Sequence, residues 1–289
     1  MRHIVQLVEK LAIKEGYTQT PLPQVGVFKD SNPQGRSPYL YSQGIIFILQ
    51  GKKKIFAEHS VHEYNQRNYL VVAVPLPLEC EALIEEGKPL LGLTVNLDIS
   101  MLNNIIHLMG DSIDLNKFNV SEKDCGLYTS KLGPEVIDII FRLVKLLQNP
   151  VETNILGDGV LRELLFHLLK DEKAAPLYAL AMRNTNLSKV EMALKEIHGK
   201  YDQSINVDSL AKSVNMSVSS FHHIFKDVTS SSPIQYIKKI RLDKARSFII
   251  ENGLRVNEAA SRVGYASVSQ FSREFKRYYG VPPKDFVQG

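Results

Sequence analysis

Short apolar or alternating stretches, typical of β-strands, dominate the first 110 residues of the chain. Turn-forming pairs that contain Gly or Pro, such as Asn32-Pro33 and Gln50-Gly51, lie beside these stretches and mark where strands end. Several short strands at near-regular spacing predict a small β-barrel or jelly roll. The stretches are residues 39–49, 54–57, 69–74 and 90–95.

From Pro134 onward the apolar positions follow a helical period instead. Residues 134–148 place apolar side chains at i, i+3, i+4, i+7 and i+8, with Pro150 after the end. A second helix is predicted over residues 158–169. Two such helices attached to a small β domain often supply an oligomer interface, so we expect a homodimer through them. The alternative is that they only pack on their own barrel.

Residues 171–188 contain a Pro and several small polar side chains, which indicates a linker. After this segment the pattern is helical throughout. We therefore expect a regulatory or dimerisation domain at residues 1–170 and an all-α domain at residues 189–289. Together they predict a multidomain α+β protein, in which an N-terminal β-barrel or jelly roll with appended helices precedes the helical domain.

The C-terminal region repeats its own sequence. Residues 207–226 match residues 256–276 at an offset of 49 positions, which becomes 50 after one inserted residue. Two copies of one unit are therefore present, at residues 207–229 and 256–280.

Each unit has the pattern of a helix-turn-helix motif. Its first short helix carries small alanines that let the next helix approach closely. Asn215 and Gly264 follow at the turn, where a residue tolerant of positive φ is needed. Ser217 and Ser267 then stand where a side-chain oxygen can cap the second helix.

The second helix of each unit has one apolar face, so its polar face is identified by subtraction. Arg and Gln can hydrogen-bond base edges in the major groove, Ser can add single hydrogen bonds, and Lys suits phosphates. The alternatives are that Arg273 only clamps a phosphate and that Ser219 is only solvated. The candidate DNA-binding residues are Ser219, His222, His223 and Lys226 in the first unit and Ser269, Gln270, Arg273 and Lys276 in the second.

Residues 233–251, between the units, are predicted to form one helix about 28 Å long. One turn of DNA is about 34 Å. Such a linker helix can therefore place the two recognition helices in successive major grooves on one face of double-stranded DNA.

The distribution of charge points to a polyanionic partner for the C-terminal third alone. Residues 186–289 contain 16 Lys and Arg against 10 Asp and Glu, whereas the rest of the chain contains 19 against 21. The alternative is a solvated surface that happens to be basic.

The composition of the 289 residues, 44% hydrophobic and 23% charged, is that of a globular protein and excludes wholesale disorder and fibrous repeats. Cys80 and Cys125 cannot build a disulfide framework, which points to a reducing compartment. No apolar run approaches 18 residues, and the N-terminus lacks the apolar core of a signal peptide. We therefore expect a cytoplasmic protein without a membrane partner.

Residues 190–287 closely resemble the double helix-turn-helix domain of AraC/XylS-type transcription regulators. The segment GYASVSQFSREFKRYYGVPPKDF, residues 264–286, is close to that family's signature at almost every position. The resemblance implies sequence-specific DNA binding and, most often, activation of transcription through contact with RNA polymerase. One departure is His223, where the family often has Arg. The first unit is therefore expected to read bases less strongly, or with some pH dependence.

Residues 35–110 resemble, more loosely, the cupin-like regulatory domain at the front of some of these regulators. The positions that carry this resemblance are residues 44–53, Tyr64, and residues 69–72 and 74–79. The resemblance implies that the domain binds a small-molecule effector or mediates dimerisation.

Effector-binding residues are expected to be polar or aromatic side chains on the inner face of the barrel. Tyr39, Tyr41 and Gln43 alternate and can share one face, with Arg36 near the mouth, so these four are the candidates. One alternative is that they face outward. Another is that the domain binds no ligand and only dimerises, in which case activity follows protein concentration.

A cupin-like domain also raises the hypothesis of a metalloenzyme fused to a DNA-binding module. His59 and His62 form an H-x-x-H pair, but residues three apart on a strand point to opposite faces, and the further ligands of a cupin metal site are missing. The sequence contains no G-x-S-x-G, no P-loop and no G-x-G-x-x-G. We therefore expect no catalytic residue, metal or cofactor, and this alternative is the least favoured.

Overall fold

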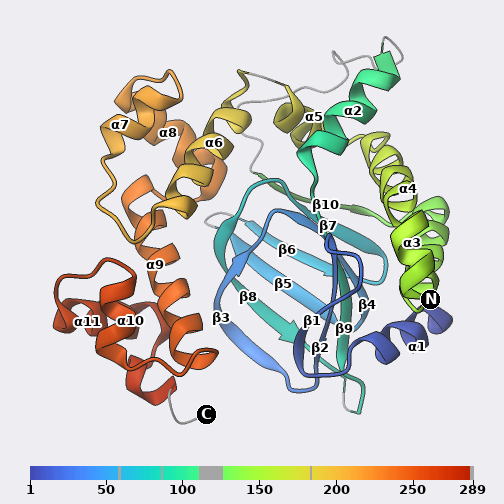
Figure 1. The fold of residues 1–289 in the computed structure, drawn as a ribbon, viewed down its shortest axis with the longest axis horizontal. Coiled ribbons are helices and arrows are strands. Elements are labelled where there is room, and N and C mark those ends of the chain that lie inside the picture. The colour runs from blue at the N-terminus through green and yellow to red at the C-terminus, as the bar shows by residue number, and fades with distance from the viewer. Residues whose placement is uncertain (58–59, 86, 111–125, 183, 287–289) are drawn as a thin grey trace.

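The computed structural model describes residues 1–57, 60–85, 87–110, 126–182 and 184–286. A β-rich domain lies at the centre of the molecule (Figure 1). Helices that precede residue 182 cover one side of it, and the C-terminal helices lie on the other side (Figure 1). This is the α+β architecture with a helical C-terminal domain that the sequence predicts.

Two antiparallel sheets form the β-rich domain, in the strand orders β1-β2-β9-β4-β7-β10 and β3-β8-β5-β6. The first sheet contains β1 (Gly16–Gln19), β2 (Val25–Asp30), β9 (Leu90–Asn96), β4 (Gly44–Gln50), β7 (Asn68–Val72) and β10 (Leu127–Lys131). The second contains β3 (Gln34–Tyr41), β8 (Leu76–Leu83), β5 (Lys52–Ala57) and β6 (Ser60–Asn65).

Burial along the strands shows which faces are covered. On β8 the inward residues Leu76, Leu78 and Cys80 are buried, while the alternating Glu79 is partly exposed. By contrast, β4 is buried continuously from Gly44 to Leu49. The barrel interior covers one face of β4, and the N-terminal helix α1 (Arg2–Leu11) contacts the strand as well. A strand that is covered on both faces carries an unbroken apolar run.

The predicted strand at residues 39–49 is two strands in different sheets. β3 ends at Tyr41 and pairs with β8, and β4 begins at Gly44 and pairs with β7 and β9. At the corner between them, Gln43 Nε2 donates to the carbonyl of Ala73 at 2.7 Å. The apolar pattern continues through this corner, and so the change of sheet is not visible in it.

Four helices before residue 170 are described: α1, α2 (Ile99–Met109), α3 (Pro134–Leu146) and α4 (Pro150–Leu169). α3 matches the predicted first helix of the pair, and α3 and α4 pack against each other. α4 begins eight residues earlier than the predicted start at residue 158, because Asn149 caps it and Pro150 occupies its first turn. Its first half exposes apolar side chains such as Ile155, which obscures the helical period.

The segment at residues 171–188, predicted as a linker, contains the short helix α5 (Ala175–Ala181) and the start of α6. Residues 175–180 are buried, and the hydroxyl of Tyr178 donates to the carbonyl of Leu169 at 2.9 Å. The Pro in this segment lies in the first turn of α5, where the missing N–H has no helical partner to lose. Pro and small residues here belong to a packed helix rather than to an extended connection.

The C-terminal domain is helical throughout its described residues. Its first helix-turn-helix unit follows α6, α9 forms the connection, and a short 3₁₀ helix follows the second unit. The helices are α6 (Asn186–Gly199), α7 (Val207–Ser213), α8 (Val218–Thr229), α9 (Pro233–Ile250), α10 (Val256–Arg262), α11 (Val268–Tyr279) and the 3₁₀ helix Pro283–Phe286.

The two helix-turn-helix units belong to different apolar cores. The first unit, with Phe221 and Phe225, belongs to the same continuous apolar cluster as the barrel. The second unit has a separate cluster around Phe271 and Phe275. α9 contributes Ile240 to the first cluster and Leu242 to the second, so this one helix connects both cores.

α9 also contacts the outer side of the barrel at β3 and β8. The hydroxyl of Tyr236 donates to the carbonyl of Pro75 at 2.9 Å, and Lys239 Nζ donates to the carbonyl of Pro77 at 3.4 Å. No helix within the described residues is long and apolar enough to cross a membrane.

Candidate DNA-binding surface and effector site

The turn of the first helix-turn-helix unit forms as its residue types predict. Asn215 takes the left-handed conformation with φ of 56°, one of the few side chains that tolerates it. Ser217 Oγ then accepts from the backbone N–H of Ser220 at 3.2 Å and caps α8. This turn sets the direction of α8 relative to α7.

The turn of the second unit is more constrained. Gly264 has φ of +79°, and a Cβ at this position would collide with the backbone carbonyl of Asp202. Glycine is therefore required twice, for the conformation and for the close approach. Ser267 Oγ accepts from the backbone N–H of Gln270 at 3.3 Å and caps α11.

Both recognition helices, α8 and α11, turn their phenylalanines inward and their polar residues outward. Phe221, Phe225, Phe271 and Phe275 are fully buried. Of the candidate DNA-binding residues, His222 is partly buried and the other seven are exposed. Those seven are Ser219, His223, Lys226, Ser269, Gln270, Arg273 and Lys276. The structure thus brings each predicted set to one exposed helix face.

The side chains on the α11 face differ in how they are held. Gln270 Nε2 donates to Glu274 Oε1 at 3.2 Å, and Glu274 also accepts from Lys238 Nζ at 2.9 Å and Tyr265 Oη at 2.8 Å. Burial acts against ionisation of Glu274, but these hydrogen bonds outweigh it and lower its pKa. Among the described residues, Arg273 has no hydrogen bond or ion pair, so its guanidinium remains available to a partner.

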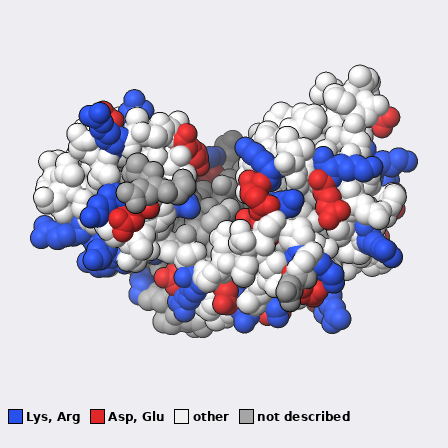
Figure 2. Space-filling model, turned by 90° about the horizontal axis from the view of Figure 1, so that it is seen from below, with Lys and Arg blue, Asp and Glu red and all other residues white. Residues whose placement is uncertain are grey.

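On α8, His223 Nε2 lies 3.3 Å from Asp227 Oδ2. Seen from below, the lobe of C-terminal helices at the left shows mainly Lys and Arg along its outer edge, with few Asp and Glu (Figure 2).

The four candidate effector residues do not converge. Tyr39 and Tyr41 share the inner face of β3, where their ring centroids lie 4.8 Å apart, and the hydroxyl of Tyr41 lies 3.2 Å from that of Tyr64. Gln43 instead forms the corner hydrogen bond to Ala73. The structure therefore does not group these residues at one site.

Arg36 lies on the other face of the sheet. Its Nε donates to Glu79 Oε2 at 2.5 Å, and its guanidinium lies 4.1 Å from the centroid of the Phe56 ring. Phe56 and Glu79 are register partners on the outer face of β5 and β8. Arg36 lies three positions before Tyr39, so strand alternation by itself places the two side chains on opposite faces, and a bulge in β3 between Gln34 and Ser37 falls at this point.

Lys53 on β5 is the inward-facing polar residue that the sequence analysis missed. It is 8% exposed, and its Nζ lies 4.9 Å from the centroid of the Tyr39 ring. In the run Lys52-Lys53-Lys54-Ile55, Lys53 and the buried Ile55 are two positions apart and share one face. This alternation in the sequence identifies Lys53 as a residue that faces the barrel interior.

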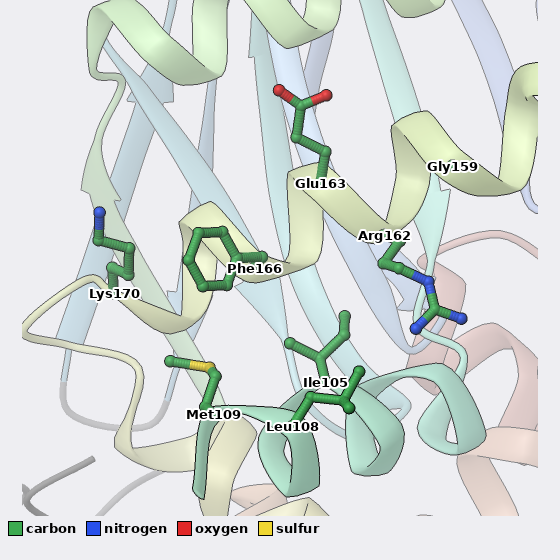
Figure 3. A pocket seen from close by; sticks show the side chains of 8 residues that line it. All are labelled: Ile105, Leu108, Met109, Gly159, Arg162, Glu163, Phe166 and Lys170. Carbon is green, nitrogen blue, oxygen red and sulfur yellow. The ribbon is translucent and has the colours of Figure 1, made fainter. Parts of the chain in front are cut away.

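A groove of about 650 Å³ lies between α2 and α4. Ile105, Leu108, Met109 and Phe166 point toward one another across it, and Glu163 points away (Figure 3). Arg162 Nη1 donates to Asn104 Oδ1 at 2.5 Å beside the groove. Leu108 is 72% exposed, so this apolar surface is open to solvent.

Metal ligation finds no support in the described part of the chain, where no three His, Cys, Asp or Glu side chains are grouped to hold an ion. His59, one of the H-x-x-H pair, lies outside the described residues, as does Cys125. His62 Nε2 lies 2.9 Å from Ser60 Oγ, and Cys80 is a buried free thiol.

Two family models match the chain. Residues 21–176 match the model for the N-terminus of AraC-type transcriptional regulators, and residues 210–289 match a helix-turn-helix domain. Among curated relatives, the transcriptional regulator GbdR of Pseudomonas aeruginosa is 26% identical over 73% of this chain and 50% of its own length. The transcriptional activator RhaS of Escherichia coli is 26% identical over 65% of this chain and 69% of its own.

Solved structures of ToxT from Vibrio cholerae share the fold. ToxT with a bound unsaturated fatty acid aligns at a TM-score of 0.62 and 14% identity, over 91% of this chain and 94% of that one. An apo ToxT variant aligns at a TM-score of 0.63 and 13% identity, over 95% and 99%. The barrel with its appended helices, the paired helix-turn-helix units and the two family matches together show that this chain belongs to the AraC family of DNA-binding transcription regulators.

Proposed function

We propose that this regulator activates transcription by placing α8 and α11 in two successive major grooves of promoter DNA. The observation that carries the proposal is the pair of exposed polar faces joined by α9. That helix of 18 residues is about 27 Å long, close to one turn of DNA at about 34 Å. Each face lies opposite two buried phenylalanines, so the cores hold the recognition residues in place.

The proposed readers of base edges are Ser269, Gln270 and Arg273 in the second unit and Ser219, His222 and His223 in the first. Arg and Gln form the bidentate pairs that distinguish bases in the major groove. Lys226 and Lys276 are proposed to contact phosphates, which position the protein without reading sequence. Because the first unit lacks an Arg here, we expect it to discriminate less between bases.

Activation, through contact with RNA polymerase, is proposed because one of the curated relatives is described as an activator. We further propose that residues 1–170 are the regulatory part and residues 189–289 the DNA-binding part. α5 between them is packed rather than extended, so we expect the two parts to respond to each other.

The proposed dimer interface is the outward face of α4 together with α2. Val151, Ile155, Leu156 and Phe166 on α4 and Leu108 on α2 are large apolar side chains left exposed in the single chain. Contiguous exposed apolar surface of this kind marks protein interfaces. A second copy of the chain would cover it.

A small-molecule effector is proposed to act through the barrel domain. One ToxT structure of the same fold holds an unsaturated fatty acid and another holds a naphthyl butenoic acid. The competing proposal is a domain that only dimerises, and the exposed apolar face of α4 favours it. The two differ in whether a small molecule changes DNA affinity.

The experiment is fluorescence anisotropy of the full chain on labelled DNA from the neighbourhood of its own gene, with random DNA and a salt series beside it. Specific binding at least tenfold tighter than random binding supports the proposal. Equal affinity for both DNAs, with the same salt slope, would show that the two units only bind phosphates and would refute it.

A further inference from the structure

Lys53 is a charged residue in the interior of the barrel. It lies on β5 opposite Tyr64 of β6 and Ala82 of β8, which are both buried, and only 8% of its surface is exposed. Taking an ammonium group out of water is unfavourable unless a partner compensates its charge. A buried lysine of this kind therefore needs a specific explanation.

Other groups of the chain compensate the charge of the Lys53 ammonium only weakly. Within the described residues, no hydrogen bond or ion pair reaches its Nζ, although an ammonium has three donors. Asp30 on β2 interacts with it electrostatically without forming an ion pair, and burial raises the pKa of this carboxyl. The compensation that Asp30 offers is thereby reduced.

Aromatic rings surround the ammonium instead. Its Nζ lies 4.9 Å from the ring centroid of Tyr39, 5.8 Å from that of Phe28 and 6.0 Å from that of Tyr41. The Phe28 ring can lie flat on the sheet because its register partner is Gly92, where a Cβ would collide with the ring. Such rings attract a cation electrostatically, but they are poor acceptors for the N–H donors of the ammonium.

Tyr39 lies next to the ammonium and close to the DNA-binding domain. Its surface is 48% exposed, while desolvation of its hydroxyl raises its pKa to about 12. Asp243 and Arg246 of α9 lie near enough to shift that pKa in opposite directions, and both α9 and α11 contact β3. A ligand that displaces Tyr39 would therefore disturb the surface on which the DNA-binding domain rests.

We propose that Lys53 is the anchor for the anionic group of the effector, a monocarboxylate with an apolar or aromatic body. The three donors of the ammonium would bind the carboxylate, and the rings of Phe28, Tyr39 and Tyr41 would contact the body. A single cation among rings suits one negative charge, whereas phosphates are usually held by several N–H groups or Arg forks. This proposal rests on the proposed effector response and names its chemistry.

The test is isothermal titration calorimetry of the full chain with sodium butyrate, decanoate, oleate and benzoate, each below its micelle concentration. The corresponding alcohols, which keep the body and lose the charge, are titrated in parallel. We expect at least one acid to bind and its alcohol to bind at least tenfold more weakly, because the alcohol cannot form a charge-assisted hydrogen bond.

The matched variants are Lys53→Met and Lys54→Met. Met keeps the length of the side chain without its charge, and Lys54 points to the opposite face of the same strand. Lys53→Met should weaken the acid about tenfold to a hundredfold, whereas Lys54→Met should leave its affinity unchanged. Circular dichroism melting checks that both variants fold.

Three results would overturn the proposal: no acid binds the native chain, an acid binds Lys53→Met as tightly as the native chain, or Lys53→Met fails to fold. The last would show that the barrel itself needs the charge. DNA anisotropy without any acid separates this failure from failure of the proposed function. If specific DNA binding persists while no acid binds, only the effector chemistry is wrong.

Discussion

At the scale of single residues, the two candidate base readers on α11 are prepared differently. Gln270 is held by Glu274, which Lys238 and Tyr265 hold in turn, so the orientation of its amide is set before DNA arrives. Arg273 is exposed and unpaired among the described residues. It gains its partners on binding and loses none, which makes its removal the cleanest test of base reading.

Arg273→Ala is expected to cost about 1–3 kcal/mol of binding free energy at the specific site and to relax selectivity in one half of it. The bidentate contact to a base edge is lost while the phosphate contacts remain. Anisotropy on the specific site and on single-base variants of it measures both effects. Arg262→Ala on α10 is the control. An equal loss on specific and random DNA would assign Arg273 to phosphate binding instead.

Lys276→Ala is expected to weaken binding to all DNA sequences and to lower the salt slope by about one unit. A phosphate contact releases a counterion without sensing the base. Affinities measured between low and high salt test this expectation, with Lys195→Ala on α6 as the control. A change confined to the specific site would contradict the phosphate role.

His198 gives the C-terminal domain a predictable response to acid. Its Nε2 lies 2.9 Å from the hydroxyl of Tyr236, which itself donates to Pro75, so Nε2 donates to that hydroxyl. Burial lowers the pKa of His198 to about 4, below the value of about 6.5 in an unfolded chain. The unfolded state therefore binds more protons between these values, and stability falls as the pH falls through this window.

His198→Gln should make the melting temperature less dependent on pH between about 6.5 and 4, because Gln keeps a donor to Tyr236 and cannot titrate. Thermal unfolding followed by circular dichroism at several pH values is the measurement. His3→Gln near the N-terminus is the control and should leave the dependence unchanged. An unchanged slope in His198→Gln would show that other groups govern the acid response.

At the scale of elements, the two helix-turn-helix units form the same turn with different residues. Asn215 and Gly264 both have positive φ, at 56° and 79°, and Gly264 also packs directly against the backbone carbonyl of Asp202. The sequence predicts the first property from the residue types. The second depends on the loop before α7, which lies some 60 positions earlier in the chain.

Gly264→Ala is expected to destabilise the second unit by more than the roughly 1–2 kcal/mol that a left-handed conformation costs a residue with a Cβ. The added Cβ must displace the carbonyl of Asp202. Gly253→Ala is the matched control, with φ of +64° and nothing within 4 Å of the new Cβ. Urea unfolding of both variants measures the difference, and equal losses would mean that only the backbone conformation matters.

At the scale of the whole molecule, α9 connects the barrel domain to both helix-turn-helix units. It carries residues of both apolar cores, and its Tyr236 and Lys239 donate to carbonyls on the barrel side of the interface. The first unit shares its core with the barrel, while the second has its own. We therefore expect a change at the barrel to reach α8 and α11 through this one helix.

Ile155→Asp on α4 is expected to shift the proposed dimer to monomers without loss of fold. Ile155 is 74% exposed in the single chain, so its removal leaves no cavity, whereas a carboxylate in a dimer interface would be desolvated. Sedimentation velocity over a concentration series measures the association. Ile13→Asp, at a residue 81% exposed and outside α4, is the control. An unchanged distribution for Ile155→Asp would place the interface elsewhere.

The sequence by itself determined the C-terminal third of this protein. The helical period, the turn residues Asn215 and Gly264, and the capping serines are local signals. Each of them occurs in both copies of the internal repeat. The inward phenylalanines and the outward polar residues of α8 and α11 follow directly from them. Local interactions alone set these features, and so they could be predicted without the fold.

Only the tertiary structure decided what the barrel brings together. Strand pairing brings Arg36 to Glu79 and Phe56 on the outer face, the corner at Gln43 moves the chain into the other sheet, and β5 carries Lys53 to the rings of Phe28 and Tyr39. Each of these depends on pairing between strands far apart in the chain. A one-residue change of register moves every side chain of a strand to the opposite face of the sheet. The hydrophobic periodicity of the sequence alone does not reveal such a change.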